Sequence, residues 1–150
     1  MYGAISPVSG LTGAQMTGGP NEIWSYGEEV FTILKDLVFL RERLRPYITT
    51  QMHFAHTEGL PLMRPLLLEF PSDPESWEID DEFMFGPDLL VAPITRLGAR
   101  SRDVYLPEGP TWVDVWTGEQ LNGRVTISVP APLRQIPLFL RDGAELPIRT

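Results

Sequence analysis

The sequence predicts a mainly β protein with an N-terminal helical segment: an antiparallel β-sandwich preceded by one or two helices. Residues 27–57 carry apolar side chains at helical spacing, which predicts the helices. After Leu60 the sequence breaks into short apolar or alternating runs. Turn-forming residues, many of them glycine or proline, separate these runs at intervals of roughly 8 to 12 residues, a pattern typical of antiparallel sandwiches.

The composition indicates a globular protein with an ordinary core. Of 150 residues, 43% are hydrophobic and 21% are charged, which is close to average usage. The net charge of −8 argues against a nucleic acid partner, because no basic stripe is present to neutralise phosphates. The absence of cysteine excludes disulfides and thiolate metal sites. No apolar run approaches the roughly 20 residues that cross a bilayer, so no membrane partner is expected.

Residues 1–22 are expected to form a loop or tail rather than part of the folded domain. This segment is rich in Gly, Ser and Thr and lacks the basic start and long apolar stretch of a signal peptide. Ser9 lacks the flanking residues of a nucleophile elbow. Gly18–Pro20 is not a phosphate loop, because proline removes an amide donor and no lysine follows.

The helical segment is expected to contain two helices. The first runs over Gly27–Leu44, with Ser25 as its N-cap and acidic residues in its first turn, where the helix dipole favours them. The second runs over Pro46–Thr57, because proline is tolerated in a first turn, and Gly59 ends it. The apolar stripe of the first helix consists of Val30, Ile33, Leu34, Leu37, Val38 and Leu44.

The strands are expected at residues 65–70, 89–94, 102–106, 112–116, 125–129, 136–140 and 145–148. Two of these runs, Pro65–Phe70 and Leu89–Ile94, are continuously apolar, as in strands buried on both faces. The run Val125–Val129 alternates and is the clearest half-buried strand. The expected division is therefore a tail at 1–22, a helical segment at 23–59 and a β-sandwich domain at 60–150.

Four acids near the middle of the chain raise the question of glycosidic catalysis. Asp80, Asp81 and Glu82 precede a Phe-Met-Phe cluster, and Asp88 follows a Gly-Pro corner. A glycosidase places two carboxyl groups about 5 to 9.5 Å apart on either side of one bond. Adjacent acids in a loop point in different directions and accept hydrogen bonds from turn amides, so a structural role is favoured.

Two further groups have alternative interpretations. His53 and His56 are three residues apart on the second helix, but structural zinc generally requires four ligands, so neither a metal nor another cofactor is expected. Trp112, Trp116 and Tyr105 could form a platform for sugar rings. Aromatic residues of a small sandwich more often fill its core, with their polar atoms bound to a partner, and this interpretation is favoured.

Five blocks in a fixed order carry a resemblance to a known family. They are LRERLRPY, GLPLMRPLLLEFP, DDEFMFGPDLLVAP, YLPEGPTWVDVWTG and IPLFLRDG. The order and content of these blocks resemble glycoside hydrolase family 31, which includes α-glucosidases and α-xylosidases. The resemblance covers roughly Trp24 to Ile148.

The resemblance implies a C-terminal, non-catalytic part of such an enzyme. In that family a (β/α)8 barrel carries the catalytic aspartates, in motifs similar to W-x-D-M-N-E and H-W-x-G-D, and neither motif occurs here. The family's substrate-contacting R-x-H-G segment is also missing. The segment Trp24–Glu28 is similar to the start of the last barrel helix, with Ile23 in place of a proline. The resemblance therefore implies the last barrel helix followed by the adjoining β-sandwich, with no catalytic, substrate-binding or metal-binding residue.

This interpretation implies specific partners and leaves alternatives open. The helical segment would pack against the rest of the barrel or self-associate, and carbohydrate would reach the chain through the parent enzyme. The main alternative is a free-standing carbohydrate-binding β-sandwich module that uses exposed Trp and Tyr. A third hypothesis is a fold that serves only as an interaction surface.

Overall fold

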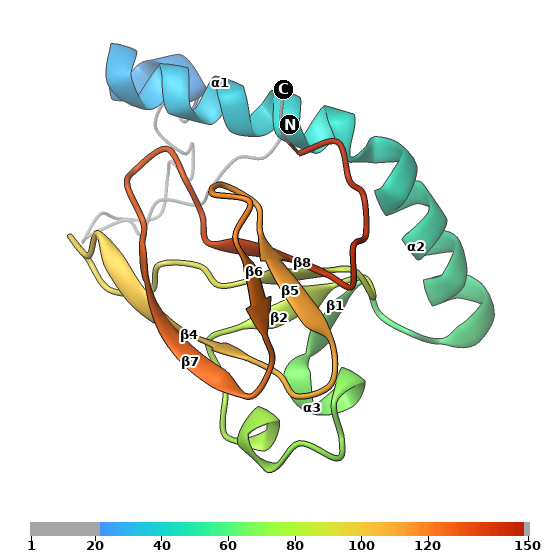
Figure 1. Ribbon diagram of the computed structural model, residues 1–150. Coiled ribbons are helices and arrows are strands. Elements are labelled where there is room, and N and C mark those ends of the chain that lie inside the picture. Colours follow the sequence, from blue (N-terminus) through green and yellow to red (C-terminus); the bar gives the residue numbers. More distant parts are fainter. Residues whose placement is uncertain (1–21, 149–150) are drawn as a thin grey trace, which may run out of the picture. The chain divides into compact units, whose positions relative to one another are not determined.

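The computed structural model describes residues 22–148 (Figure 1). The chain divides into two compact units, Met1–Phe39 and Leu40–Thr150. The expectations for Ser9 and Gly18–Pro20 lie outside the described residues, as does almost all of the expected tail. The three-part domain division made from the sequence stays a prediction.

The first unit contains a short 3-10 helix, η1 (Ile23–Tyr26), and most of α1 (Glu28–Arg43). Gly27 separates them with a φ of 87°, which only glycine adopts readily. The first α-helical bond of α1 runs from the Phe31 amide to the Gly27 carbonyl at 2.8 Å. Ser25 lies inside η1, so the prediction that it caps α1 is wrong.

The second unit begins within α1 and continues into α2 (Arg45–Glu58). Leu44 lies between the two helices, and its amide and carbonyl both continue the helical bonding. Pro46 lies in the first turn of α2, where a missing amide hydrogen breaks no helical bond. Gly59 ends α2 in the left-handed region with φ 74°, as the sequence predicts.

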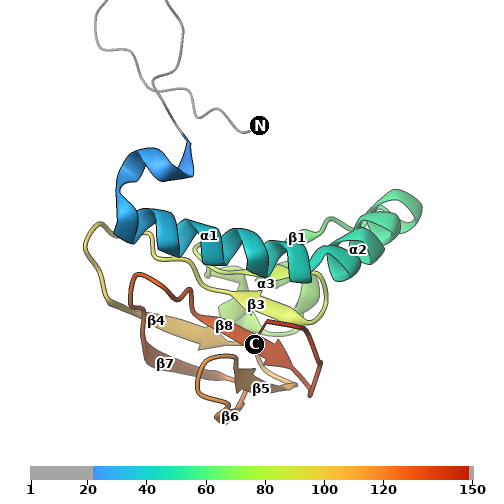
Figure 2. The same cartoon turned by 90° about the horizontal axis from the view of Figure 1, so that it is seen from above.

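The strands form two antiparallel sheets (Figures 1 and 2). The larger sheet has the order β1-β2-β3-β8-β5-β6, and the smaller one pairs β4 with β7. The bounds are β1 (Met63–Pro65), β2 (Phe83–Phe85), β3 (Leu89–Val91), β4 (Ser101–Leu106), β5 (Thr111–Asp114), β6 (Gln120–Asn122), β7 (Val125–Pro130) and β8 (Leu138–Arg141). This arrangement confirms the predicted antiparallel β-sandwich preceded by helices.

Both faces of the six-stranded sheet are covered by apolar residues. Because side chains alternate along a strand, Leu90 and Phe139 join one core cluster while their neighbours Leu89 and Leu138 join another. The first cluster fills the space between the two sheets and includes Val104 of β4. The second includes Leu40, Leu44, Ile48, Leu146 and Ile148 from the helices and the C-terminal segment. Two buried faces explain the continuous apolar run of residues 89–92.

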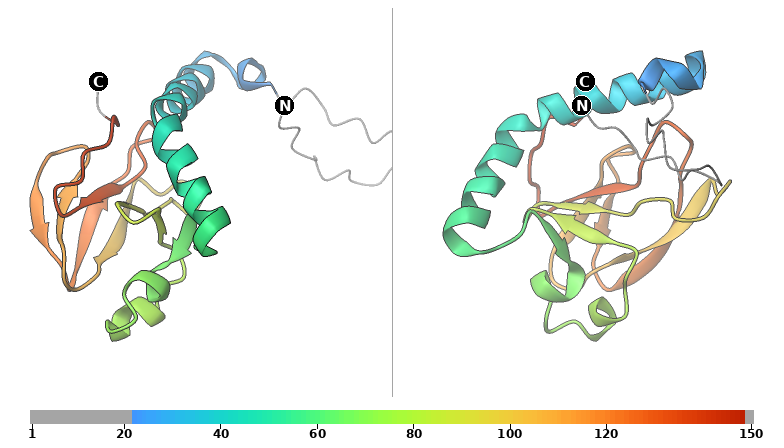
Figure 3. Two further views of the ribbon diagram at one scale, coloured as in Figure 1. Left: turned by 90° about the vertical axis from the view of Figure 1, so that its right-hand side faces the viewer. Right: turned by 180° about the vertical axis from the view of Figure 1, so that it is seen from behind.

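One expected strand is wrong in part. Only Met63–Pro65 forms a strand, and the following residues form α3 (Leu66–Glu69), closed by a bond from the Phe70 amide to the Leu66 carbonyl. Leu66 is fully buried, whereas Leu68 is exposed. Figure 3 shows α3 beside β1 and the 3-10 helix η2 (Pro74–Trp77). A short apolar run fits a buried helical turn as well as a strand, so periodicity could not separate them.

The expected strand at residues 145–148 is also wrong. This segment is irregular, and two of its backbone carbonyls are bound by a side chain instead of a neighbouring strand. The Arg43 guanidinium donates to the carbonyls of Pro147 at 3.1 Å and Ile148 at 3.2 Å. Ile148 is nevertheless buried, because it packs with Leu44 in the second core cluster.

Candidate functional site

The acids before β2 converge on one guanidinium. Arg102 of β4 lies 2.7 Å from Asp81 Oδ1 and 3.2 Å from Glu82 Oε1. It also donates to the carbonyls of Asp81 at 3.0 Å and Pro93 at 2.6 Å. The Tyr105 amide donates to Glu82 Oε1 at 2.9 Å. These contacts fasten the loop before β2 to β4, so Asp81 and Glu82 both have a structural role here.

Glu82 is the acid with the most unusual environment. Its side chain is 2% exposed, and burial raises its pKa to about 7 against the opposing effects of the Tyr105 amide and Arg102. Among residues 22–148, its Oε2 atom is buried without a hydrogen-bond partner. A raised carboxyl pKa can mark a general acid. Glu82 also lines a hollow of about 360 Å³ together with Asp80 and Asp81.

The geometry around Glu82 does not form a glycosidic pair. Asp81 and Glu82 bind the same cation, whereas the two catalytic carboxyls must face each other across one bond. Glu82 Oε1 is bound by the Tyr105 amide and by Arg102, which leaves it little capacity to accept from a substrate. Asp80 is exposed at the edge of the hollow.

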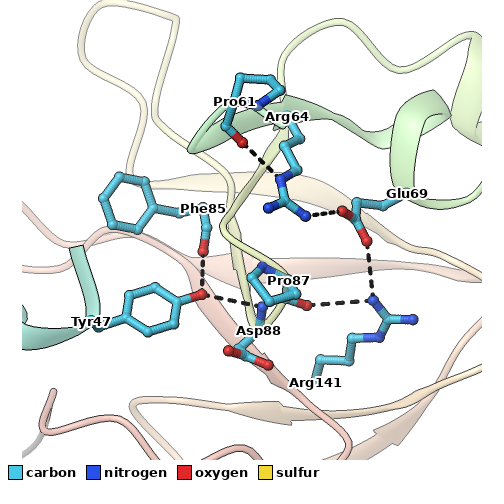
Figure 4. A network of polar contacts seen from close by, with 8 residues as sticks. All are labelled: Tyr47, Pro61, Arg64, Glu69, Phe85, Pro87, Asp88 and Arg141. Atoms are coloured by element: carbon cyan, nitrogen blue, oxygen red, sulfur yellow. Dashed lines mark hydrogen bonds and ion pairs between the residues drawn. The ribbon is translucent and has the colours of Figure 1, made fainter. Parts of the chain in front are cut away.

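Asp88, the fourth acid, belongs to a corner held by Tyr47 (Figure 4). The Tyr47 hydroxyl donates to the Phe85 carbonyl at 2.8 Å and accepts from the Asp88 amide at 3.3 Å. Burial raises the pKa of Tyr47, so this hydroxyl remains a donor. Gly86 lies against it with φ 64°, and a Cβ atom there would stand 2.2 Å from the Tyr47 oxygen.

A partly buried ion network lies beside this corner (Figure 4). Glu69 forms ion pairs with Arg64 and, at 3.4 Å, with Arg141. Arg64 Nε also donates to the Pro61 carbonyl at 2.7 Å, and Arg141 donates to the Pro87 carbonyl at 3.4 Å. The network thus joins α3, β1, β8 and the Gly-Pro corner. Both oxygens of Glu69 are occupied by partners within the fold.

A second buried carboxylate, Asp73, was not singled out from the sequence. It accepts bonds from the Tyr105 hydroxyl at 2.7 and 2.9 Å, the Glu108 amide at 2.9 Å, Ser76 Oγ at 3.2 Å and the Glu75 amide at 3.2 Å. Burial alone would raise the pKa of Asp73, but these donors together hold it below its ordinary value. The only sequence signal is an aspartate before a proline, which is typical of a helix N-cap.

The aromatic residues do not form a shared platform. Trp112 is completely buried, and its Nε1 donates to the Pro107 carbonyl at 3.1 Å. Tyr105 is 4% exposed. Trp116 is half-buried and donates to the Ile136 carbonyl at 2.6 Å. The hypothesis of a sugar-binding surface made by these three residues is therefore wrong, and the core interpretation is confirmed for Trp112 and Tyr105.

The local turn explains why Trp112 and Trp116 separate. β5 ends at Asp114, whose Oδ1 accepts the amides of Trp116 at 2.7 Å and Thr117 at 3.0 Å. The strand alternation stops at this turn, so Trp116 packs with the second core cluster while Trp112 belongs to the first. Aspartate commonly bonds to amides that follow it in turns.

The two histidines, His53 and His56, are exposed on α2, and the His53 ring lies 6.4 Å from the Phe54 ring. Within residues 22–148, no cluster of three or more His, Cys, Asp or Glu side chains has an arrangement that could hold a metal ion. No helix in this part of the chain is both long and apolar enough to cross a membrane.

Comparisons with known proteins agree with the architecture. Residues 59–146 match the glycosyl hydrolase family 31 C-terminal domain. The chain is 37% identical over 86% of its length to an α-xylosidase of Saccharolobus solfataricus, of which it covers 18%. It is similar to a soil-metagenome α-xylosidase complexed with xylose, at TM-score 0.82 and 52% identity, over 85% of this chain and 19% of that one. It is also similar to a dextranase of Flavobacterium johnsoniae complexed with isomaltotriose, at TM-score 0.80 and 41% identity, over 85% of this chain and 16% of the dextranase.

Proposed function

The chain belongs to glycosyl hydrolase family 31, and from this premise we propose that it supports the catalytic portion of an α-glycosidase without performing the reaction itself. It spans less than a fifth of the length of the relatives described above. Residues 22–148 form a sandwich and the helices before it. A supporting role fits a module in which Asp73, Arg64 and Arg102 are bound by groups of its own fold.

The observation that carries the proposal is the shared partner of Asp81 and Glu82. Retaining and inverting glycosidases both need two carboxyl groups with different roles on opposite sides of the scissile bond. Here the neighbouring acids bind one guanidinium, Arg102, at 2.7 and 3.2 Å. Buried Asp73 and half-buried Glu69 are likewise bound by donors within the fold.

The proposed partner is the rest of the enzyme, which contacts the helical segment. Val30 and Val38 of the expected stripe are 39% and 50% exposed, and Phe39 next to them is 56% exposed. By contrast Leu44 of the same stripe is buried in the second core cluster. Exposed apolar residues gathered on one element typically mark an interface. In the isolated chain the same surface is expected to cause self-association.

The class of substrate follows from the relatives. Two solved relatives are complexed with xylose and isomaltotriose, and other relatives are an α-xylosidase and an α-glucosidase. We therefore propose that the complete protein acts on α-linked sugars. Glucosides, xylosides and glucans all remain within this proposal.

An activity assay tests the catalytic part of the proposal. The isolated chain is expected to release no chromophore from nitrophenyl α-glucoside or α-xyloside, because Asp81 and Glu82 share one cation and do not face each other as an acid and a nucleophile must. Turnover that disappears in Asp81→Asn or Asp88→Asn would contradict a structural role for these acids.

Light scattering at low micromolar concentration tests the interface. We expect the isolated chain to be larger than a monomer, and Val38→Glu to shift it towards the monomer because a buried charge opposes association. Glu119→Gln, at an exposed position after β5, serves as the control and should leave the size unchanged. A monomeric wild-type chain with protected helix amides would argue against the interface.

A further inference from the structure

Trp77 is a large aromatic residue held at the surface in a fixed position. Its side chain is 57% exposed, although its Nε1 atom donates to the Pro71 carbonyl at 3.1 Å. Trp77 ends η2, whose first turn is capped by the Asp73 carboxylate through the Glu75 amide. The bond from Nε1 and the capped turn restrict the indole ring, so it is presented to solvent with little conformational freedom. This pre-organisation lowers the entropic cost of binding a ligand.

A hollow lies next to the edge of this ring. It has a volume of about 250 Å³ and is lined by Glu69, Phe70, Pro71, Ser72, Asp73 and Glu108. Pro71 belongs to this lining and also accepts the bond from Trp77 Nε1, so the nitrogen edge of the indole stands at the rim. Pro71 therefore links the edge of the indole to the hollow.

The polar groups that line the hollow differ in how many hydrogen bonds they can still form with a ligand. Asp73 already accepts from several donors, and Glu69 is bound to two arginines, so neither has much capacity for a ligand. Ser72 is exposed, and the Glu108 side chain is 49% exposed, with only an exposed ion pair to Arg124 at 3.3 Å. A hydroxyl and an accessible carboxylate offer both donor and acceptor groups to a ligand.

The charge around Trp77 excludes anionic ligands. Glu75, Glu78 and Glu108 are all exposed, and the whole chain carries a net charge of −8. Phosphates, nucleotides and acidic sugars would be repelled by this field. A neutral ring that is apolar on its C–H face and carries hydroxyls at its edge suits both the indole and the acceptors. Pyranose sugars have this chemistry.

We propose that Trp77 and the neighbouring hollow form a surface site for a neutral oligosaccharide of pyranose units. One sugar ring stacks on the exposed indole, and its hydroxyls bond to Glu108 and Ser72. The choice of α-linked sugars as ligands rests on the proposed function, but binding here requires no catalysis. The site would hold a glycan on the module.

The test is a binding titration of the 150-residue chain with maltotriose and isomaltotriose. Calorimetry should show saturable binding in the millimolar range. Trp77→Ala should weaken the affinity at least about tenfold, as expected for the loss of one stacking contact. Trp24→Ala removes another exposed tryptophan, 66% exposed in η1, and is the matched control that should bind like the wild type.

Fluorescence assigns the binding to the ring. In a Trp24→Phe background, Trp77 is the most exposed indole of residues 22–148, since Trp112 is buried and Trp116 is half-buried. Sugar should then change the emission in a saturable manner, and Trp77→Phe should retain part of the affinity through its flat ring. If circular dichroism shows that Trp77→Ala is unstable, Glu108→Gln takes its place. This variant leaves Trp77 in place and should weaken binding, because it removes the carboxylate that accepts from the sugar hydroxyls.

Three results would overturn the proposal. They are no saturable binding by the wild type, equal affinity in Trp77→Ala, or loss of binding in Trp24→Ala alone. Failure of sugar binding would leave the supporting role intact, because that role depends on the absence of hydrolysis and on the helical interface. Hydrolysis by the isolated chain would contradict the supporting role without affecting the Trp77 site.

Discussion

Glu82 should make the stability of this protein fall as the pH rises towards neutrality. Its pKa is about 7 in the folded chain, mainly because of burial, against an ordinary value of 4.5. Between pH 4.5 and about pH 7 the Glu82 carboxyl is therefore protonated in the folded state more often than in the unfolded state. Because stability falls with pH wherever the folded state binds more protons, the loss begins near pH 4.5 and levels off above about pH 7. The difference of roughly two and a half pKa units corresponds to about 3 kcal/mol.

Glu82→Gln should remove this dependence. The amide carbonyl can still accept from the Tyr105 amide, and glutamine carries no charge to bury. Near pH 5 the wild-type carboxyl is protonated and also neutral, so we expect the variant to be similarly stable there and to keep a nearly flat profile up to pH 8. Urea denaturation at pH 5, 6, 7 and 8 measures both profiles.

Asp81→Asn is the matched control, because Asp81 contacts the same guanidinium but its side chain is 45% exposed. The control should keep most of the wild-type slope. A wild-type free energy of unfolding that stays constant from pH 5 to pH 8 would refute the reasoning. A slope that survives in Glu82→Gln would also refute it, because another group would then be responsible.

Three further substitutions test other parts of the fold. Gly86→Ala should destabilise the fold by about 1–3 kcal/mol or more, since its Cβ would stand 2.2 Å from the Tyr47 oxygen. Gly59→Ala is the control, because Gly59 has a similar positive φ but open space around it, so this variant measures the backbone strain alone. Equal melting temperatures of the two variants would argue against the clash. Trp112→Ala should cost about 3–5 kcal/mol in urea denaturation, and an unchanged midpoint would contradict its core position. Asp73 has a lowered pKa, so it stabilises the fold above its ordinary value of 3.8 and this contribution is lost as the pH falls. Asp73→Asn should therefore be less stable at pH 6 and lose less on acidification, and a parallel acid profile would contradict this.

The helices and most strands could be predicted because their signals are local. A first-turn proline and a stop at Gly59 define α2 closely, and alternation defines β7. The expected strand at Pro65–Phe70 was wrong because three consecutive leucines, residues 66–68, fit one helical turn as well as a strand, and the burial of Leu66 decides between them. Whether a short apolar run without alternation forms a strand or a helix depends on its tertiary packing, which the sequence pattern does not give.

The environment of the acids could be predicted only in part. A structural role for Asp81 follows from turn chemistry, but the pairing with Arg102 joins residues 21 positions apart. The bond between Asp73 and Tyr105 spans 32 positions, and only the folded sandwich brings them together. The raised pKa of Glu82 likewise arises from burial beneath β4, which no local pattern reports.

The contact between Arg43 and the carbonyls of Pro147 and Ile148 has a consequence for synthesis. It joins positions 104 and 105 residues apart, and Ile148 is also part of the cluster that covers Leu44. A ribosome adds about 5–20 residues per second, so α2 leaves the exit tunnel roughly 5 to 20 seconds before its last packing partners exist. During that interval its apolar residues have no native cover, and the emerging chain would be a substrate for chaperones until β8 and the final residues arrive.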